Sequence, residues 1–162
     1  MTLDIEITAP DTEQFLAAAD ELAASFGWQL QSFQRDEEVV ALVDLNKDPF
    51  FEQILWVYDP KQAFLRCLLV SRAVVPEERE AAVTELCARI NSGLLSGCLE
   101  FSFNDRALIF RDSAELKYGP VASILSSTSA RLLSLGSRYA SAICDTLAGS
   151  SPADAVKASE LD

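Results

Sequence analysis

The chain contains no histidine, which removes the most common general base and the most common metal ligand among side chains. Paired carboxylates are therefore the first candidates for general acid and base catalysis. Two groups of acids are close enough in sequence to act together, namely Asp11, Glu13, Asp20 and Glu21, and Glu77, Glu78 and Glu80. Both groups fall on the polar side of amphipathic helical patterns, which is typical of a solvated surface rather than of an active site.

Two further segments have the composition of catalytic or phosphate-binding loops, but the elements around them are not those in which such loops occur. The hydroxyl-rich run Ser126–Ser129 lies in a helical pattern, with no base nearby and no G-x-S-x-G motif. The segment Gly93–Gly97 follows a predicted helix and precedes a strand, whereas phosphate-binding loops follow a strand and open a helix. We therefore expect no catalytic residue and no cofactor, and we expect that the chain is not an enzyme.

The four cysteines, Cys67, Cys87, Cys98 and Cys144, are the remaining reactive side chains. Their spacing matches no metal-binding or redox motif. All four lie among apolar neighbours, so we expect them to be small buried side chains. The sequence predicts no metal site and no essential disulfide.

Composition and charge favour a single domain that does not bind nucleic acids or anionic membranes. The 162 residues suit a single domain, and 13 Lys and Arg stand against 25 Asp and Glu, giving a net charge of −12. Nucleic acids and anionic membranes select basic surfaces, and no basic cluster is present. No signal peptide is recognisable at Met1–Thr8, and no apolar run approaches the roughly 20 residues of a membrane span. We expect a soluble, cytoplasmic protein.

The first half of the chain predicts a helix followed by a block of strands. Strict alternation predicts a strand at Thr2–Thr8, and a helical stripe follows from Asp11 to Phe26. Asp11 and Gln14 form a capping-box pattern, and Gly27 ends the helix. Runs of β-branched and aromatic residues between turn signals then predict a short strand at 28–33 and strands at Val39–Leu45, Phe51–Tyr58 and Ala63–Val70.

The second half predicts two helices that flank a hairpin. Pro76 opens a helix that runs to Ile90, and strands follow at Cys98–Phe103 and Ala107–Arg111. A long helix runs from Pro120 to Leu147, in which Gly136 marks a bend or a close helix contact. Residues 150–162 are predicted to be a flexible acidic tail after a single domain at 1–149.

Short turns between consecutive strands require antiparallel pairing, so the fold class is α+β. We predict an antiparallel sheet of five to six strands with three helices, in the order (β)-α-β-β-β-α-β-β-α. Trp56 and Tyr58 lie two apart on one strand and share a face, and Phe64 follows across a turn. Leu55 and Val57 make the other face apolar too. Such a sheet is either covered twice within one subunit or offers one face to a partner.

Several segments resemble the YbjN family of small bacterial proteins. They are Val75–Glu78 at the start of a helix, Arg89–Leu94, Gly97–Phe101, Arg111, and Arg138–Gly149. Ser92 and Leu99 depart from the pattern. The resemblance implies the fold of type III secretion chaperones, α-β-β-β-α-β-β-α. It further implies a role like that of sensory-transduction or stress regulators, as homodimers that bind unfolded segments of a client.

These observations together predict a non-enzymatic protein-binding module that is chaperone-like or regulatory. Trp56, Tyr58 and Phe64 are the candidate partner-binding residues, although the pattern of the strands favours core packing for the same side chains. The small residues Ala81, Ala82 and Ala88 of the helix at Pro76–Ile90 would allow close approach in a homodimer. A small-molecule-binding regulator, with a pocket between the sheet and the C-terminal helix, is the alternative function.

Overall fold

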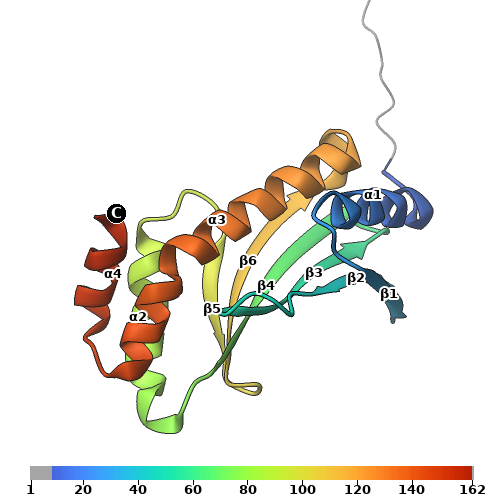
Figure 1. Cartoon of the computed structure of the whole chain (residues 1–162). Coiled ribbons are helices and arrows are strands. Elements are labelled where there is room, and N and C mark those ends of the chain that lie inside the picture. Colours follow the sequence, from blue (N-terminus) through green and yellow to red (C-terminus); the bar gives the residue numbers. More distant parts are fainter. Residues whose placement is uncertain (1–8, 162) are drawn as a thin grey trace, which may run out of the picture.

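The computed structural model describes residues 9–161, which form a six-stranded antiparallel sheet and four α-helices (Figure 1). The predicted α+β class and antiparallel sheet are confirmed. The predicted strand at Thr2–Thr8 lies outside the described residues. In chain order the elements are α1 (Thr12–Ser25), β1 (Leu30–Arg35), β2 (Glu38–Asp44), β3 (Phe51–Asp59), β4 (Phe64–Val74), α2 (Glu80–Ser92), β5 (Cys98–Ser102), β6 (Ala107–Glu115), α3 (Val121–Ala148) and α4 (Pro152–Glu160).

The strand order across the sheet is β1-β2-β3-β4-β6-β5, and every neighbouring pair is antiparallel. Four strands precede α2, one more than the order α-β-β-β-α-β-β-α implied by the resemblance. The additional strand is β1, which turns into β2 through Asp36, a residue with φ of 54°. Strand β1 is mostly polar, so its backbone hydrogen bonds to β2 stabilise it more than its intrinsic strand propensity does.

Helix α1 forms as its capping residues predict. The Gln14 backbone N–H donates to Asp11 Oδ1 at 2.8 Å, and the Asp11 N–H donates to Gln14 Oε1 at 3.0 Å. This reciprocal pair satisfies two backbone donors at the helix start. Gly27 follows the last turn with φ of 69°, a conformation that favours glycine. The apolar stripe of α1 buries Phe15, Ala19 and Ala23.

Helix α3 has 28 residues and crosses the sheet over β4 and β6 (Figure 1). A Cβ atom added at Gly136 would lie 2.7 Å from Leu69 Cδ2 and 2.8 Å from Phe51 Cζ. Gly136 therefore marks a close contact between α3 and the sheet, one of the two roles that the sequence left open. Within residues 9–161, neither α3 nor any other helix combines the length and apolar content needed to cross a membrane.

The predicted flexible tail is wrong, because residues 152–160 form α4. The Ser151 hydroxyl accepts from the Asp154 N–H at 3.2 Å, and Pro152 occupies the first turn, where its missing N–H costs nothing. Ala155 and Val156 are buried, and α4 packs against both α2 and α3. The structured domain thus extends past residue 149, and the described chain has four helices rather than three.

One face of the sheet is packed by helices, as α1 and α3 show in Figure 1. Buried side chains from alternate strand positions form a single cluster with α1, α2, α3 and α4. The strand residues in this cluster include Val39, Ala41, Val43, Ile54, Trp56, Tyr58, Leu65, Cys67, Leu69, Leu99, Leu108 and Phe110. The intervening positions of the same strands belong to the opposite face, and no residue of that face joins the cluster.

Candidate protein-binding surface

Trp56 and Tyr58 do share a face, as predicted, but it is the face covered by helices. Both side chains are fully buried. Trp56 Nε1 donates to Ser129 Oγ of α3 at 2.8 Å, and the Tyr58 hydroxyl donates to the Pro10 carbonyl at 2.5 Å. Side chains held in the core in this way cannot contact a partner. Their assignment as partner-binding residues is therefore wrong, and core packing is their role.

Phe64 lies on the other face of the sheet from Trp56 and Tyr58. Leu65 pairs with Tyr58 across the β3–β4 ladder and is buried with it, so Phe64, one residue earlier, points the opposite way. It is half-buried and stands opposite Asp59 and Glu115 in the register. Of the three predicted residues, only Phe64 lies on a face that no described helix covers.

That uncovered face is apolar along its centre. Leu55 of β3 is flanked in the register by Leu42 of β2 and Leu68 of β4, and all three are half-buried. Its other apolar members are Phe33, Val40, Val57, Phe64, Val70 and Ile109. Phe33 is 49% exposed. We call this surface, with the charged residues on the same face, the uncovered sheet face.

The charged side chains of the uncovered sheet face pair with one another. Arg35 Nη2 lies 3.2 Å from Glu38 Oε2, and Arg66 forms an ion pair with the same carboxylate. Arg111 Nη2 lies 2.6 Å from Glu100 Oε1. Because these pairs are partly exposed, each contributes little to stability, but together they leave no arginine of this face without a partner.

Asp44 is satisfied by neutral groups of the same face. The side-chain amide of Gln53 donates to it at 2.8 Å and that of Gln31 at 3.2 Å. Polar groups at the margins of the face thus satisfy each other. At the centre the leucines are partly exposed, whereas Val40 and Val57 are already buried between their neighbours.

The two edges of the sheet differ in accessibility. At β5, the Asn91 side chain from α2 both accepts from the Leu99 N–H, at 2.8 Å, and donates to the Leu99 carbonyl, at 3.0 Å. This contact blocks the β5 edge against an additional strand. At β1, the only backbone ladder among the described residues is the one to β2. Strand addition is therefore geometrically possible at β1, next to Phe33.

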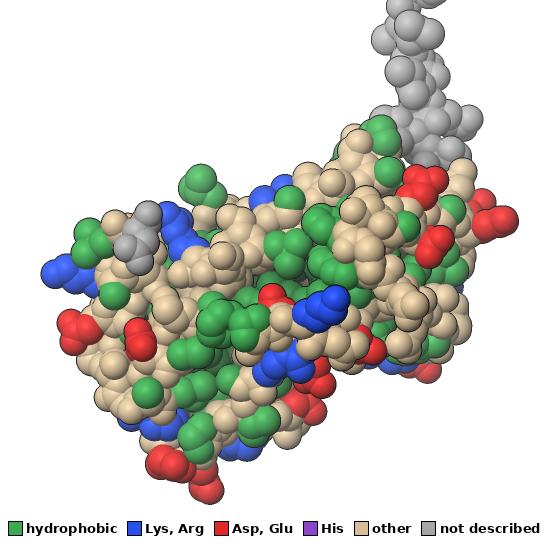
Figure 2. Space-filling view, in the orientation of Figure 1, with side chains coloured by type: hydrophobic (Ala, Val, Ile, Leu, Met, Phe, Trp, Pro, Cys, Tyr) green, Lys and Arg blue, Asp and Glu red, His purple; other side chains and the backbone are tan. Residues whose placement is uncertain are grey.

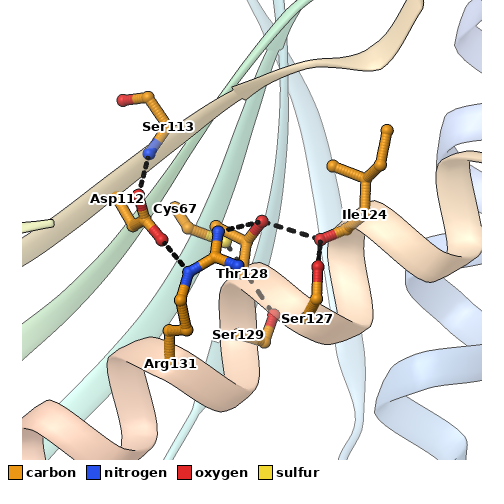
Figure 3. Close-up of polar contacts among 8 residues, drawn as sticks. All are labelled: Cys67, Asp112, Ser113, Ile124, Ser127, Thr128, Ser129 and Arg131. Carbon is orange, nitrogen blue, oxygen red and sulfur yellow. Dashed lines mark hydrogen bonds and ion pairs between the residues drawn. The ribbon is translucent and has the colours of Figure 1, made fainter. Parts of the chain in front are cut away.

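The hydroxyl-rich run on α3 belongs to a polar network between α3 and the sheet (Figure 3). Arg131 Nε donates to the buried carboxylate of Asp112 at 2.7 Å, and the Ser113 N–H donates to the same carboxylate at 2.8 Å. The hydroxyls of Ser127 and Thr128 donate to the Ile124 carbonyl, at 3.1 Å and 2.7 Å. Because these side chains hydrogen-bond to one another and to the backbone, the network holds α3 on the sheet. None of its hydroxyls is activated by a neighbouring base.

The four cysteines are free thiols in two different settings. Burial raises the pKa of Cys67 and of Cys87 to about 12, so both thiols are protonated at neutral pH and are poor nucleophiles. Cys98 is half-buried on the uncovered sheet face, and Cys144 is exposed on α3. The expectation that all four are buried is confirmed for Cys67 and Cys87, holds only in part for Cys98 and is wrong for Cys144. Apolar neighbours in sequence do not show which face of α3 Cys144 occupies.

The candidate carboxylates are dispersed over the surface. Asp11, Glu13, Asp20 and Glu21 are exposed on α1, as predicted, and Glu80 pairs with Arg106 at 3.2 Å. In the part of the chain that the structure describes, no group of three or more Cys, Asp or Glu side chains is placed to hold a metal ion.

A cavity of about 200 Å³ lies between the sheet and α3, and its walls include Phe51, Ser71, Ala140, Ile143 and Cys144. A larger hollow of about 570 Å³ adjoins it at Pro49 and carries mixed polar and apolar side chains. Figure 2 shows hydrophobic side chains gathered across the middle of the molecule on the side where α3 lies. The cavity is in the place predicted for a small-molecule pocket.

Comparison with known proteins identifies no relative. No protein-family model matches the chain, and no curated protein is similar to it. The resemblance to the YbjN family therefore stays a prediction, and the function is inferred from the geometry of the surface.

Proposed function

We propose that the chain is a non-enzymatic protein-binding module, chaperone-like or regulatory, and that its uncovered sheet face contacts another protein chain. The apolar centre of that face carries the proposal. An antiparallel sheet with one solvated face normally alternates apolar and polar side chains, whereas Leu42, Leu55 and Leu68 stand where polar residues are expected. Covering one such partly exposed leucine stabilises a complex by roughly 1 kcal/mol.

The chemistry of the other candidate groups supports binding rather than catalysis. The thiols of Cys67 and Cys87 stay protonated at neutral pH. Asp112 is neutralised by Arg131, and the adjacent hydroxyls donate to the backbone of α3. An enzyme needs a nucleophile or base within reach of an open site, and none of these groups meets that requirement.

The β1 edge supplies a route for a client segment. An extended peptide that pairs with Leu30–Arg35 would gain backbone hydrogen bonds, and its alternate side chains would reach Phe33 on the uncovered sheet face. The acidic surface around this edge, with Asp36 and Glu37 at the β1–β2 turn, favours clients with basic flanks.

A small-molecule-binding regulator is the second candidate, and the cavity beside α3 favours it. Its volume of about 200 Å³ is below the roughly 300–1,000 Å³ of typical ligand sites. Its walls are mainly apolar, and Ser71 and Arg72 are the polar residues that line it. This cavity suits only a small ligand, since a cavity of about 150 Å³ already accommodates benzene, so we place protein binding first.

Capture of partners from a cell lysate tests the proposal with two matched variants. Leu55→Lys/Leu68→Lys adds two positive charges to the uncovered sheet face, and Ala81→Lys/Ala88→Lys adds the same charge to the exposed side of α2. We expect the sheet variant to lose bound protein by at least tenfold, because burying each lysine costs more than 1 kcal/mol. Equal capture by both variants, measured by quantitative mass spectrometry, would reject the uncovered sheet face as the binding surface.

A further inference from the structure

We infer that the protein chain covering the uncovered sheet face is a second copy of this chain, so that two sheets pack face to face in a symmetric dimer. The inference rests on the proposed function, because it names the occupant of the same surface. Such a contact is isologous, with the same residues contributed by both subunits. Leu55 and its neighbours Leu42 and Leu68 would lie at its centre.

The first support is the distribution of charge. The whole chain carries −12, so two copies repel each other over most of their surfaces. On the uncovered sheet face the acids exceed the arginines by only two, five against three. The acids are Glu38, Asp44, Asp59, Glu100 and Glu115, and the arginines are Arg35, Arg66 and Arg111. This is a surface on which a second acidic copy can approach without a large electrostatic cost.

The second support is that the polar groups of this face need no new partners. All three arginines already have ion pairs within the face, and Asp44 accepts from two glutamines beside it. Burial against an apolar face therefore leaves no arginine unpaired, which is the usual penalty when a charged surface is covered. A basic foreign partner would be attracted less to this face than to more acidic parts of the surface, which include Asp36 and Glu37 at the β1–β2 turn.

The third support is size. Six strands spaced at about 4.8 Å make the face about 24 Å wide, and Phe64 to Val70 on β4 span about 20 Å at 3.4 Å per residue. The footprint is about 480 Å², and the accessible area of such a corrugated surface is larger. Standard interfaces cover about 600–1,000 Å² on each partner, so the dimer would lie at the lower end and dissociate in the micromolar range.

A face-to-face dimer also leaves the β1 edges open. Sheets that pack through their side chains lie about 10 Å apart and use no backbone hydrogen bonds of their edge strands. The dimer is thus compatible with strand addition at β1, and the two contacts can be tested separately.

Sedimentation velocity on the purified full chain measures the monomer–dimer equilibrium. Protein concentrations from about 1 to about 100 micromolar cover the expected dissociation constant. We expect a monomer–dimer equilibrium for the wild type and for Ala81→Lys/Ala88→Lys. We expect Leu55→Lys/Leu68→Lys to weaken the dimer by at least 100-fold, because its four lysines would be buried together. Circular dichroism confirms the fold of each variant. If the lysine variant does not fold, Leu55→Thr/Leu68→Thr, which introduces β-branched residues with high strand propensity, should weaken the dimer at least tenfold.

Two results would overturn the inference. A wild type that stays monomeric at the highest concentration excludes a second copy as the occupant, and the proposed function then stands if capture is still lost in the sheet variant. A dimer that survives in the sheet variant but dissociates in Ala81→Lys/Ala88→Lys places self-association on α2, where the small residues had suggested it.

Discussion

Replacing Trp56 with alanine is expected to lower the free energy of unfolding by about 3–5 kcal/mol, in the range of large-to-small core substitutions. The indole is fully buried beneath α3, and its Nε1 donates to Ser129 Oγ at 2.8 Å. The substitution removes both the packing of β3 against α3 and the donor to this hydroxyl. Urea or guanidinium denaturation, followed by circular dichroism, measures the change.

Trp28→Ala is the matched control, because Trp28 is the other tryptophan and is only half-buried beside Phe26, with ring centroids 4.4 Å apart. We expect it to cost less than half as much. At a temperature where the Trp56→Ala variant remains folded, this variant should capture as much partner protein from lysate as the wild type does. A small loss of stability together with lost capture would instead make Trp56 a binding residue, as the sequence had suggested.

The second large effect is expected in α4. Ala155→Asp places a carboxylate at a position that is 3% exposed, in the contact with α2 and α3. Burial of an unpaired charge is expensive, so we expect α4 to detach rather than to accept it. The free energy of unfolding then falls by about 2–3 kcal/mol, which is the contribution of docking this helix on the domain. Docking buries Pro152, Ala155 and Val156.

Ala153→Asp makes the same substitution two residues earlier, at an exposed position in the first turn of α4. An acid there interacts favourably with the helix dipole, so we expect a change within 0.5 kcal/mol. Hydrogen exchange should show loss of protection in residues 152–160 for Ala155→Asp alone. Equal stability of the two variants would mean that this segment does not pack on the domain, as first predicted.

The local signals that the sequence carries for helices and turns were sufficient for much of the fold. Asp11 with Gln14, and Gly27, define both ends of α1 because capping chemistry acts over a few neighbouring residues. Helix α3, predicted at 120–147, runs from Val121 to Ala148 for a similar reason, since its apolar stripe persists over many turns.

Which face of the sheet is covered could not be predicted from alternation. Alternation correctly places Trp56 and Tyr58 together and Leu55 and Val57 opposite, but both sets are apolar. The choice depends on where α1 and α3 pack, which is a long-range property. The pattern favours core packing for the aromatic set, because large rings contribute most to a core, but it does not exclude the competing hypothesis of a binding surface.

Helix α4 was missed because its own signals are weak. A nine-residue helix is marginal in isolation, and Ala155 and Val156 are its main apolar contribution to the core. Its stability comes from docking against α2 and α3, and this contact leaves no signal within residues 150–162. The Ser151–Asp154 pattern, with Pro152 between them, was the available signal for a helix start.

Site-specific photocrosslinking in living cells is the most direct test of the uncovered sheet face as a protein-binding surface. A benzophenone amino acid would replace Leu42 on this face and, as the control, Ser137 on the exposed side of α3. We predict discrete protein adducts from position 42, including one of twice the chain mass, and none above background from position 137. An absence of adducts at position 42 in folded protein, or the same adducts from both positions, would contradict the account.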